Sequence, residues 1–146
     1  MNMISVVIPT FNRADVVSRA ISSVFAQTID DWQLIIVDDG STDGTAQVLD
    51  ALSDGRVVIC RHSRNRGVTA AKNTGFDHVE GDWFTVLDSD DEMIPNALET
   101  MLTCAHEKGA TAVTCNCIEW SSGRFTGYGP TGDGWLTPME TTSFQG

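Results

Sequence analysis

The amino-acid sequence predicts an α/β fold in which a mostly parallel, twisted sheet is flanked by helices. Short apolar runs rich in β-branched residues alternate with segments whose apolar residues recur at helical spacing. This alternation is typical of a parallel sheet with right-handed crossovers. The runs are nearly continuous, as expected of strands buried on both faces. The 146 residues are enough for one domain with a substantial core.

The N-terminal segment contains the first predicted strand and helix. Residues 4–8 form the strand, and Pro9 ends its pairing because proline has no backbone N–H to donate. Asn12 is the expected N-cap of a helix that ends near Gln27. The apolar stripe of this helix consists of Val16, Val17, Ala20, Ile21, Val24 and Phe25.

The rest of the chain continues the pattern to about residue 118. Further strands are expected over residues 32–37, 57–60, 83–87 and 112–118, and further helices after Ser41 or Thr42, over residues 68–76 and from about Pro95. From Ser121 onward the pattern dissolves into glycine, threonine and serine. The sequence therefore predicts an α/β domain over residues 1–118 and an irregular segment over residues 119–146.

Charge and cysteine content exclude several classes of protein. A net charge of −11 argues against a nucleic-acid partner or an anionic membrane surface. The four cysteines lack the paired spacing of a zinc site and are expected to be reduced core residues. The sequence has no signal-like N-terminus and no segment that could span a bilayer. We therefore expect a cytoplasmic protein, with peripheral membrane attachment left open.

An acidic stretch directly follows the strand predicted over residues 83–87. Asp88, Asp90, Asp91 and Glu92 place four carboxylates within five residues. Such carboxylates repel one another unless a cation lies among them. Mg²⁺ and Mn²⁺ bind one or two carboxylates and leave coordination positions for substrate phosphates. The stretch therefore indicates a metal-assisted phosphate site, and its alternative is a solvated acidic turn.

Polar clusters follow three of the predicted strands, at residues 10–12, 38–41 and 88–91, and a basic segment follows the strand over residues 57–60. The basic residues of that segment are Arg61, Arg64, Arg66 and Lys72. Because ligands of doubly wound sheets bind beyond the carboxyl ends of the strands, these clusters predict one shared site that handles an anion.

A nucleotide fits this set of side chains. Asp38 or Asp39 could accept a hydrogen bond from a base, Asp88 could bind ribose hydroxyls, and Asp90 a metal on the diphosphate. Lys72 could neutralise the remaining phosphate charge. The usual glycine-rich phosphate loops are missing, and this absence makes a metal more necessary.

Four blocks of residues resemble family 2 glycosyltransferases of the GT-A fold. They are Val7–Arg13, Val37–Thr45, Asn65–Gly75 and Leu87–Asp91. The resemblance covers roughly residues 4–118 and implies a Rossmann-like GT-A fold. It also implies a nucleotide-diphosphate sugar donor, with a UDP-sugar favoured, and Mn²⁺ or Mg²⁺ as cofactor. The implied reaction is inverting transfer of the sugar to a saccharide or another hydroxyl acceptor.

The resemblance implies roles for individual residues. Asp38 or Asp39 would contact the base, and Asp88-Ser89-Asp90 would be the D-x-D motif, with Asp90 on the metal. Further residues implied near the nucleoside and the diphosphate are Thr10, Asn12, Asn65, Gly67 and Lys72.

The general base of the family lies in an acidic motif downstream of D-x-D, often Glu-Asp, and no Glu-Asp follows Asp91. The later carboxylates of Glu119, Asp133 and Glu140 have no convincing context. We therefore expect the base to lie outside this chain, with residues 119–146 as the start of an incomplete acceptor-side region.

Two alternatives remain. One is a nucleotide-binding module without transfer activity, and the less favoured one is a receiver-like phosphoacceptor domain. The histidines His62, His78 and His106 are interpreted as surface or packing residues rather than as ligands.

Overall fold

A computed structural model describes residues 3–114, 117–121 and 124–128. The elements are β1 (Ile4–Thr10), α1 (Val17–Phe25), β2 (Trp32–Asp38), α2 (Thr45–Asp50), β3 (Val57–Arg61), α3 (Val68–Phe76), β4 (Trp83–Val86), α4 (Ala97–Lys108), β5 (Cys117–Ser121) and β6 (Arg124–Tyr128). The chain divides into two compact units, Met1–Glu99 and Thr100–Gly146. The first unit contains the sheet of four strands, and the second contains the β5–β6 hairpin.

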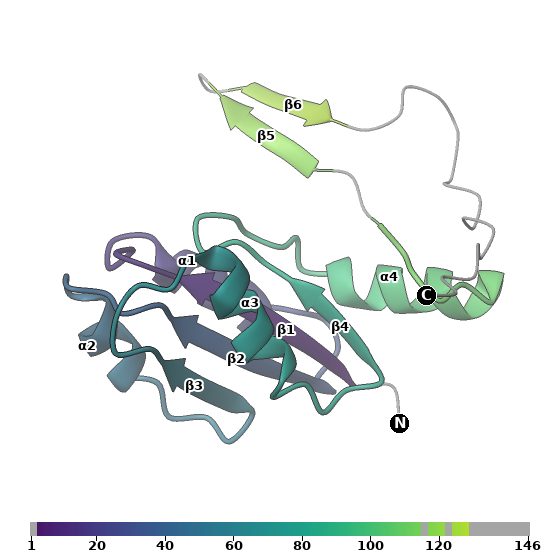
Figure 1. The fold of residues 1–146 in the computed structure, drawn as a ribbon. Coiled ribbons are helices and arrows are strands. Elements are labelled where there is room, and N and C mark those ends of the chain that lie inside the picture. Colours follow the sequence, from purple (N-terminus) through teal and green to yellow (C-terminus); the bar gives the residue numbers. More distant parts are fainter. Residues whose placement is uncertain (1–2, 115–116, 122–123, 129–146) are drawn as a thin grey trace. The chain divides into compact units, whose positions relative to one another are not determined.

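The four-stranded sheet has the order β3-β2-β1-β4, and all of its neighbouring strands are parallel (Figure 1). β1 pairs with β2 along its whole length, from Ile4 opposite Trp32 to Thr10 opposite Asp38. Both strands are buried at every residue. This burial on both faces explains why their sequences are nearly continuous apolar runs, and it confirms the predicted α/β fold with a parallel sheet.

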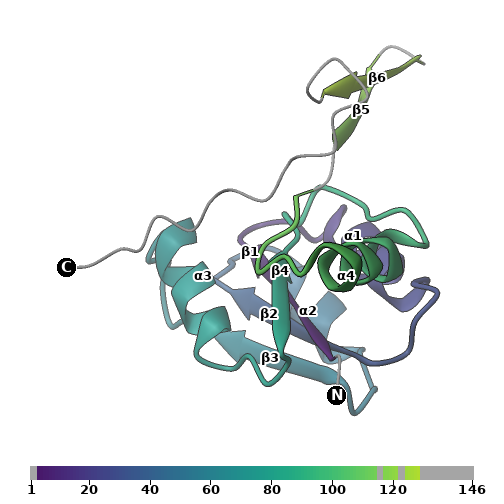
Figure 2. The ribbon, with the colours of Figure 1, turned by 90° about the vertical axis from the view of Figure 1, so that its right-hand side faces the viewer.

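The helices cover both faces of this sheet. α3 lies over one face, and α1 and α2 lie over the other (Figures 1 and 2). α1 buries Val17, Ala20, Ile21 and Val24 of the predicted apolar stripe, whereas Phe25, also predicted to be part of it, is 39% exposed. α3 approaches the sheet closely because Gly75 has no side chain: a Cβ there would overlap Cγ1 of Val7. The small residues of α3 therefore serve the close packing that the sequence predicts.

The caps of two helices differ from the sequence prediction. α1 begins at Val17 rather than after Asn12, and α2 begins at Thr45 after Gly44. Neither helix has a side-chain cap of the predicted kind, because Asn12 and Ser41 bond to each other's loops instead. The hydroxyl of Ser41 accepts the amide N–H of Asn12 at 2.9 Å, and Oδ1 of Asn12 accepts the amide N–H of Thr42 at 2.8 Å.

The strand predicted over residues 112–118 is wrong in its bounds and its pairing. Residues 112–114 are not in a strand, and β5 begins at Cys117 and pairs antiparallel with β6, from Cys117 opposite Tyr128 to Ser121 opposite Arg124. The apolar composition of this segment indicated a strand without indicating its partner. Cys115 lies outside the described residues. Within the described part of the chain, no helix combines the length and the apolar character needed to cross a membrane.

Candidate functional site

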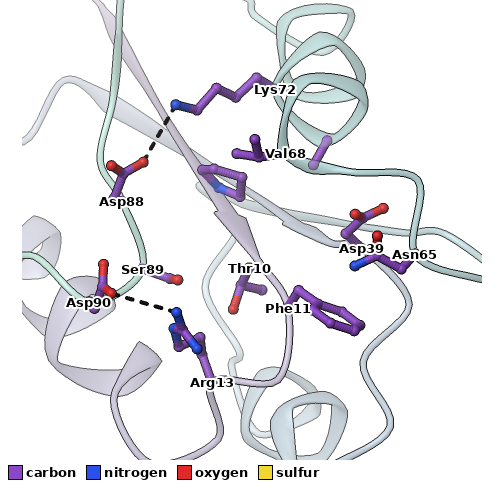
Figure 3. Close-up of a pocket in the computed structure, with 12 residues that line it drawn as sticks. Thr10, Phe11, Arg13, Asp39, Asn65, Val68, Lys72, Asp88, Ser89 and Asp90 are labelled. Atoms are coloured by element: carbon purple, nitrogen blue, oxygen red, sulfur yellow. Dashed lines mark ion pairs between the residues drawn. The ribbon is translucent and has the colours of Figure 1, made fainter.

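A cavity of about 500 Å³ lies at the carboxyl ends of β1, β2 and β4. β1 is the strand at which the chain order reverses, since β2 and β3 lie on one side of it and β4 on the other. Such switch points are the usual ligand sites of open α/β sheets. Figure 3 shows Asp39 and Asn65 on one side of the cavity, Asp88 and Asp90 on the other, and Thr10 between them. The lining residues are Pro9, Thr10, Phe11, Arg13, Asp39, Asn65, Val68, Ala71, Lys72, Asp88, Ser89 and Asp90.

Asp39 is a buried carboxylate held by three donors of the protein. Its Oδ1 accepts from Nδ1 of His62 at 2.6 Å and from the amide of Arg66 at 2.9 Å, and its Oδ2 accepts from the amide of Gly67 at 2.7 Å. Burial by itself raises the pKa of Asp39, but the hydrogen bonds from His62, Arg66 and Gly67 together outweigh it and lower the pKa below its ordinary value. Asp39 is therefore an ionised acceptor.

The structure separates the two aspartates between which the sequence could not choose. Asp38 is also buried, but its Oδ1 accepts the amide N–H of Ser41 at 2.9 Å and stabilises the turn after β2. Asp39 lines the cavity. Of the pair, Asp39 is the one whose carboxylate can reach a ligand there.

His62 is the residue of this region that sequence reasoning missed. Its side chain is 6% exposed, and its Nε2 lies 2.9 Å from the hydroxyl of Thr74 on α3, while its Nδ1 contacts Asp39. The signal in the sequence was its position directly after the third strand, at the same sheet edge as Asp39. A histidine there can pair with a strand-end carboxylate, and His62 does.

Thr10 is a residue of the cavity lining and has a buried hydroxyl. The residue is 3% exposed, and within the described residues its Oγ1 has no hydrogen-bond partner in the protein. An unpartnered buried hydroxyl costs free energy, so such a group calls for an explanation. Its position in the lining makes it available to a ligand.

Asn12, Asn65 and Gly67 have different places around the cavity. Asn12 has a φ of 52° and connects the loops after β1 and β2 through its hydrogen bonds. Its role here is to hold these two loops together, outside the cavity lining. Asn65 lines the cavity, and its Oδ1 accepts from the amide of Gly67 at 3.1 Å. Gly67 has a φ of 92°, a backbone conformation that favours glycine. In this conformation its N–H donates to Oδ2 of Asp39.

The opposite side of the cavity combines carboxylates with cations. Nζ of Lys72 lies 3.5 Å from Oδ1 of Asp88, and the guanidinium of Arg13 lies 3.7 Å from Oδ2 of Asp90 (Figure 3). All four side chains are about one-third to three-fifths exposed, so these ion pairs are weak and easily exchanged. For Asp91, burial raises the pKa, and the charges of Asp90 and Asp88 raise it further.

The cations of the cavity come only in part from the basic segment that the sequence predicts. Among the four basic residues of that segment, Lys72 lines the cavity, whereas Arg61 pairs with Asp50 at 2.6 Å and Arg64 is exposed. The cavity gains its second cation from Arg13, which follows β1 and which sequence reasoning did not single out. Its backbone amide donates to the hydroxyl of Thr45 at 2.9 Å, so the β2–α2 loop holds it in place.

The donor set around Asp90 fits a hard divalent cation that also binds a phosphate. Within the part of the chain that the structure describes, no three histidine, cysteine or acidic side chains converge on one metal position. Mg²⁺ and Mn²⁺ do not require such a cage, because they use one or two carboxylates together with water and substrate phosphates. Asp88 and Asp90, both in the cavity lining, supply carboxylates of that kind.

Comparison with known proteins shows the family of the chain. The model of the family described as "Glycosyl transferase family 2" matches residues 5–144. Glycosyltransferase GlyG of Streptococcus pneumoniae is 34% identical over 130 residues, which are 86% of this chain and 43% of the relative. The GalNAc(5)-diNAcBac-PP-undecaprenol beta-1,3-glucosyltransferase of Campylobacter jejuni is 36% identical over 121 residues, 81% of this chain and 39% of the relative. The chain thus spans about two fifths of the length of these relatives.

Solved structures share the fold. S. aureus TarS 1-349 in complex with UDP-GlcNAc superposes with a TM-score of 0.70 at 24% identity, over 75% of this chain and 32% of that one. The mannosyltransferase PcManGT from Pyrobaculum calidifontis, in complex with GDP-Man and Mn2+, has a TM-score of 0.63 at 22% identity, over 75% and 33%. These likenesses confirm the predicted GT-A fold. The family model matches residues 5–144, and on that match this chain belongs to glycosyl transferase family 2.

Proposed function

We propose that this chain is the donor-binding part of a glycosyltransferase that uses a nucleotide-diphosphate sugar, with a UDP-sugar favoured. The sugar is transferred with inversion to a hydroxyl of a saccharide or another acceptor. The observation that carries the proposal is the division of one cavity into a side with an ionised acceptor, Asp39, and a side with exchangeable ion pairs at Asp88 and Asp90. A nucleoside diphosphate matches this division, because its base can lie at Asp39 and its diphosphate at the ion pairs of the other side.

The base end of the donor lies at Asp39 in this proposal. An ionised carboxylate can accept but cannot donate, so it selects a base edge that carries an N–H. Thr10 contributes a hydroxyl that has no partner among the described residues, and Asn65 adds an amide at the same side. The complexes of S. aureus TarS with UDP-GlcNAc and with UDP support a nucleotide in this fold.

The diphosphate end lies between Asp88, Ser89 and Asp90 on one strand end and Lys72 on α3. Asp90 would hold Mn²⁺ or Mg²⁺, and the bound ion supplies positive charge that stabilises the leaving diphosphate. Lys72 and Arg13 can turn from their carboxylates to phosphate oxygens, because weak exposed ion pairs exchange partners at little cost. The Mn2+ in the PcManGT complex supports a divalent ion for this fold.

The acceptor side requires a carboxylate base that removes the proton of the attacking hydroxyl. Asp133 and Glu140 lie outside the described residues, and of Glu119 the structure gives the backbone position in β5. We propose that the base belongs to a further part of the protein. The proposal is supported by the coverage of the relatives, since this chain spans about two fifths of their length.

The test is calorimetry of this chain with UDP, GDP and dTDP, each with and without Mn²⁺. We expect binding of UDP that strengthens with Mn²⁺, and absence of heat with every nucleotide would remove the proposal. A second assay measures UDP released from UDP-sugars with candidate acceptors. Binding without release is expected both of a donor-binding part that lacks its base and of the nucleotide-binding module without transfer, whereas release of UDP would exclude that module. Labelling of one aspartate by acetyl phosphate would support the receiver-like alternative.

A further inference from the structure

His62 is fixed on three sides next to the cavity. Its amide donates to the carbonyl oxygen of Asp38 at 2.9 Å, which continues the pairing of β3 with β2 by one residue. Its ring contacts Asp39 on β2's end and Thr74 on α3, and its side chain is 6% exposed. His62 is outside the cavity lining and Asp39 is within it, so His62 would influence a ligand in the cavity through its contact with Asp39.

The partners of the ring define its orientation. An ionised carboxylate only accepts, so Nδ1 of His62 is the donor in the 2.6 Å bond to Asp39. The Thr74 hydroxyl can donate or accept, so it satisfies Nε2 at 2.9 Å. Thr74 belongs to the same helix as Lys72, which lines the other side of the cavity. His62 therefore connects the carboxylate on β2 with the helix that carries Lys72.

The hydrogen bonds of Asp39 leave one acceptor position. A carboxylate offers about four lone-pair positions, two on each oxygen. His62 and the amide of Arg66 occupy those of Oδ1, and the amide of Gly67 occupies one of Oδ2. Among the hydrogen bonds of the described residues, one position on Oδ2 remains for a ligand. Without His62, Oδ1 would also have a position available, and the carboxylate would have lost its only side-chain donor among these bonds.

We propose that His62 is a positioning residue that restricts Asp39 to a single acceptor, Oδ2, and thereby sets which nucleobase edge the cavity accepts. This inference rests on the proposed function, since it assumes a nucleotide with its base at Asp39. The favoured ligand presents one N–H donor at the position facing Oδ2, as uracil does at ring position 3. Cytosine presents a bare acceptor nitrogen at that position, which the carboxylate repels.

The experiment compares the affinities of the chain for UDP and CDP, measured by calorimetry with Mn²⁺. The quantity of interest is the ratio of the two dissociation constants, because a general loss of structure weakens both ligands alike. The variants are His62→Leu, which removes both ring contacts, and His62→Asn, whose amide N–H can replace the Nδ1 donor. Thr74→Val removes the second contact of the ring and leaves His62 itself in place.

The wild type is expected to prefer UDP. The preference should fall about tenfold in His62→Leu, the size of a hydrogen bond to a charged group, and return in large part in His62→Asn. Thr74→Val should give an intermediate ratio, and it tests the inference where His62→Leu fails to fold. His78→Asn is the matched control, because this histidine contacts the Thr74 carbonyl oxygen at 2.8 Å instead of Asp39, and its ratio should equal that of the wild type.

Equal affinity of the wild type for UDP and CDP would overturn the inference, and so would an unchanged ratio in His62→Leu and Thr74→Val. Either result would leave the donor site itself intact. A wild type that binds no nucleotide diphosphate would instead remove the proposed function and this inference with it.

Discussion

The amide of Asp39 donates a hydrogen bond of 2.8 Å to the carbonyl oxygen of Thr10, at the point where β1 and β2 enter the cavity. This backbone hydrogen bond therefore joins two residues of the cavity lining, Thr10 with its buried hydroxyl and Asp39 with its buried carboxylate. Groups that belong to paired strand ends keep their relative positions better than groups on free loops. The candidate base-binding side of the cavity, formed by Thr10 and Asp39, is thus preorganised.

Thr10→Val tests whether the Thr10 hydroxyl serves a ligand rather than the fold. Valine keeps the shape and removes a buried hydroxyl that has no hydrogen-bond partner among the described residues, so the free energy of unfolding should stay equal or rise by about 1 kcal/mol. UDP affinity should fall about fivefold, as for the loss of a neutral hydrogen bond. Urea unfolding and calorimetry measure the two quantities.

Thr45→Val is the matched control for Thr10→Val. The Thr45 hydroxyl is fully buried and accepts the amide N–H of Arg13 at 2.9 Å. Its loss should lower the free energy of unfolding by about 1–2 kcal/mol. An equal loss of stability in Thr10→Val would show that the Thr10 hydroxyl has a structural partner, against the present account.

Asp90→Asn tests the metal role of the acidic stretch. The substitution keeps the size of the side chain and removes a hard anionic ligand, so the Mn²⁺-dependent part of UDP binding should disappear. The free energy of unfolding should change by less than about 0.5 kcal/mol, since the pair with Arg13 is exposed. Calorimetry with and without Mn²⁺ gives the result, with Asp77→Asn at the exposed end of α3 as control. Unchanged Mn²⁺ dependence would return the stretch to a solvated acidic turn.

Gly75→Ala tests the close packing of α3 on the sheet. The added methyl group would overlap Cγ1 of Val7 and meet Cγ2 of Val37 at 3.5 Å. Overpacking of this kind should lower the free energy of unfolding by about 1–3 kcal/mol. Thermal unfolding measures the loss. Gly55→Ala is the control, because an added Cβ there meets no heavy atom of the described residues within 4 Å. Equal melting temperatures for the two variants would contradict the packing described.

Asp54→Asn tests a pH-dependent contribution to stability. The side-chain hydrogen bond from Arg56, followed by the bond from its backbone amide, lowers the pKa of Asp54 from 3.8 to about 2. A depressed pKa stabilises the fold above the unfolded value, and this contribution is lost as the pH falls from 3.8 toward 2. The wild type should therefore exceed Asp54→Asn in urea midpoint at pH 6, and the difference should shrink as the pH falls from 3.8 and vanish below about 2. A difference that stays constant across this range would contradict the pairing.

The sheet and the edge that carries the site could be predicted because both depend on local patterns. The continuous apolar runs of β1 and β2 indicate burial on both faces, and parallel strands bring their carboxyl ends to one edge. Thr10, the pair Asp38 and Asp39, Lys72 and Asp88–Asp90 were predicted in this way, and Asn65 was implied by the family resemblance. The structure brings Thr10, Asp39, Asn65, Lys72 and Asp88–Asp90 to one cavity.

The contacts between these clusters could not be predicted, because they join residues distant in the sequence. His62 pairs with Asp39 and Arg13 with Asp90 only once the strands are in register. Asn12 and Ser41 have the side chains of helix caps, yet they connect two neighbouring loops. These side chains bond to residues about thirty positions away instead of the nearby helix N–H groups that the capping preference predicts.

The most direct test of the donor site is a crystal structure of this chain grown with UDP and Mn²⁺. We expect the uracil ring with its N–H toward Oδ2 of Asp39, and the diphosphate between Lys72 and a Mn²⁺ ion on Asp90. A nucleotide bound outside this cavity, or a Mn²⁺ ion without a ligand among Asp88–Asp91, would contradict the central claim.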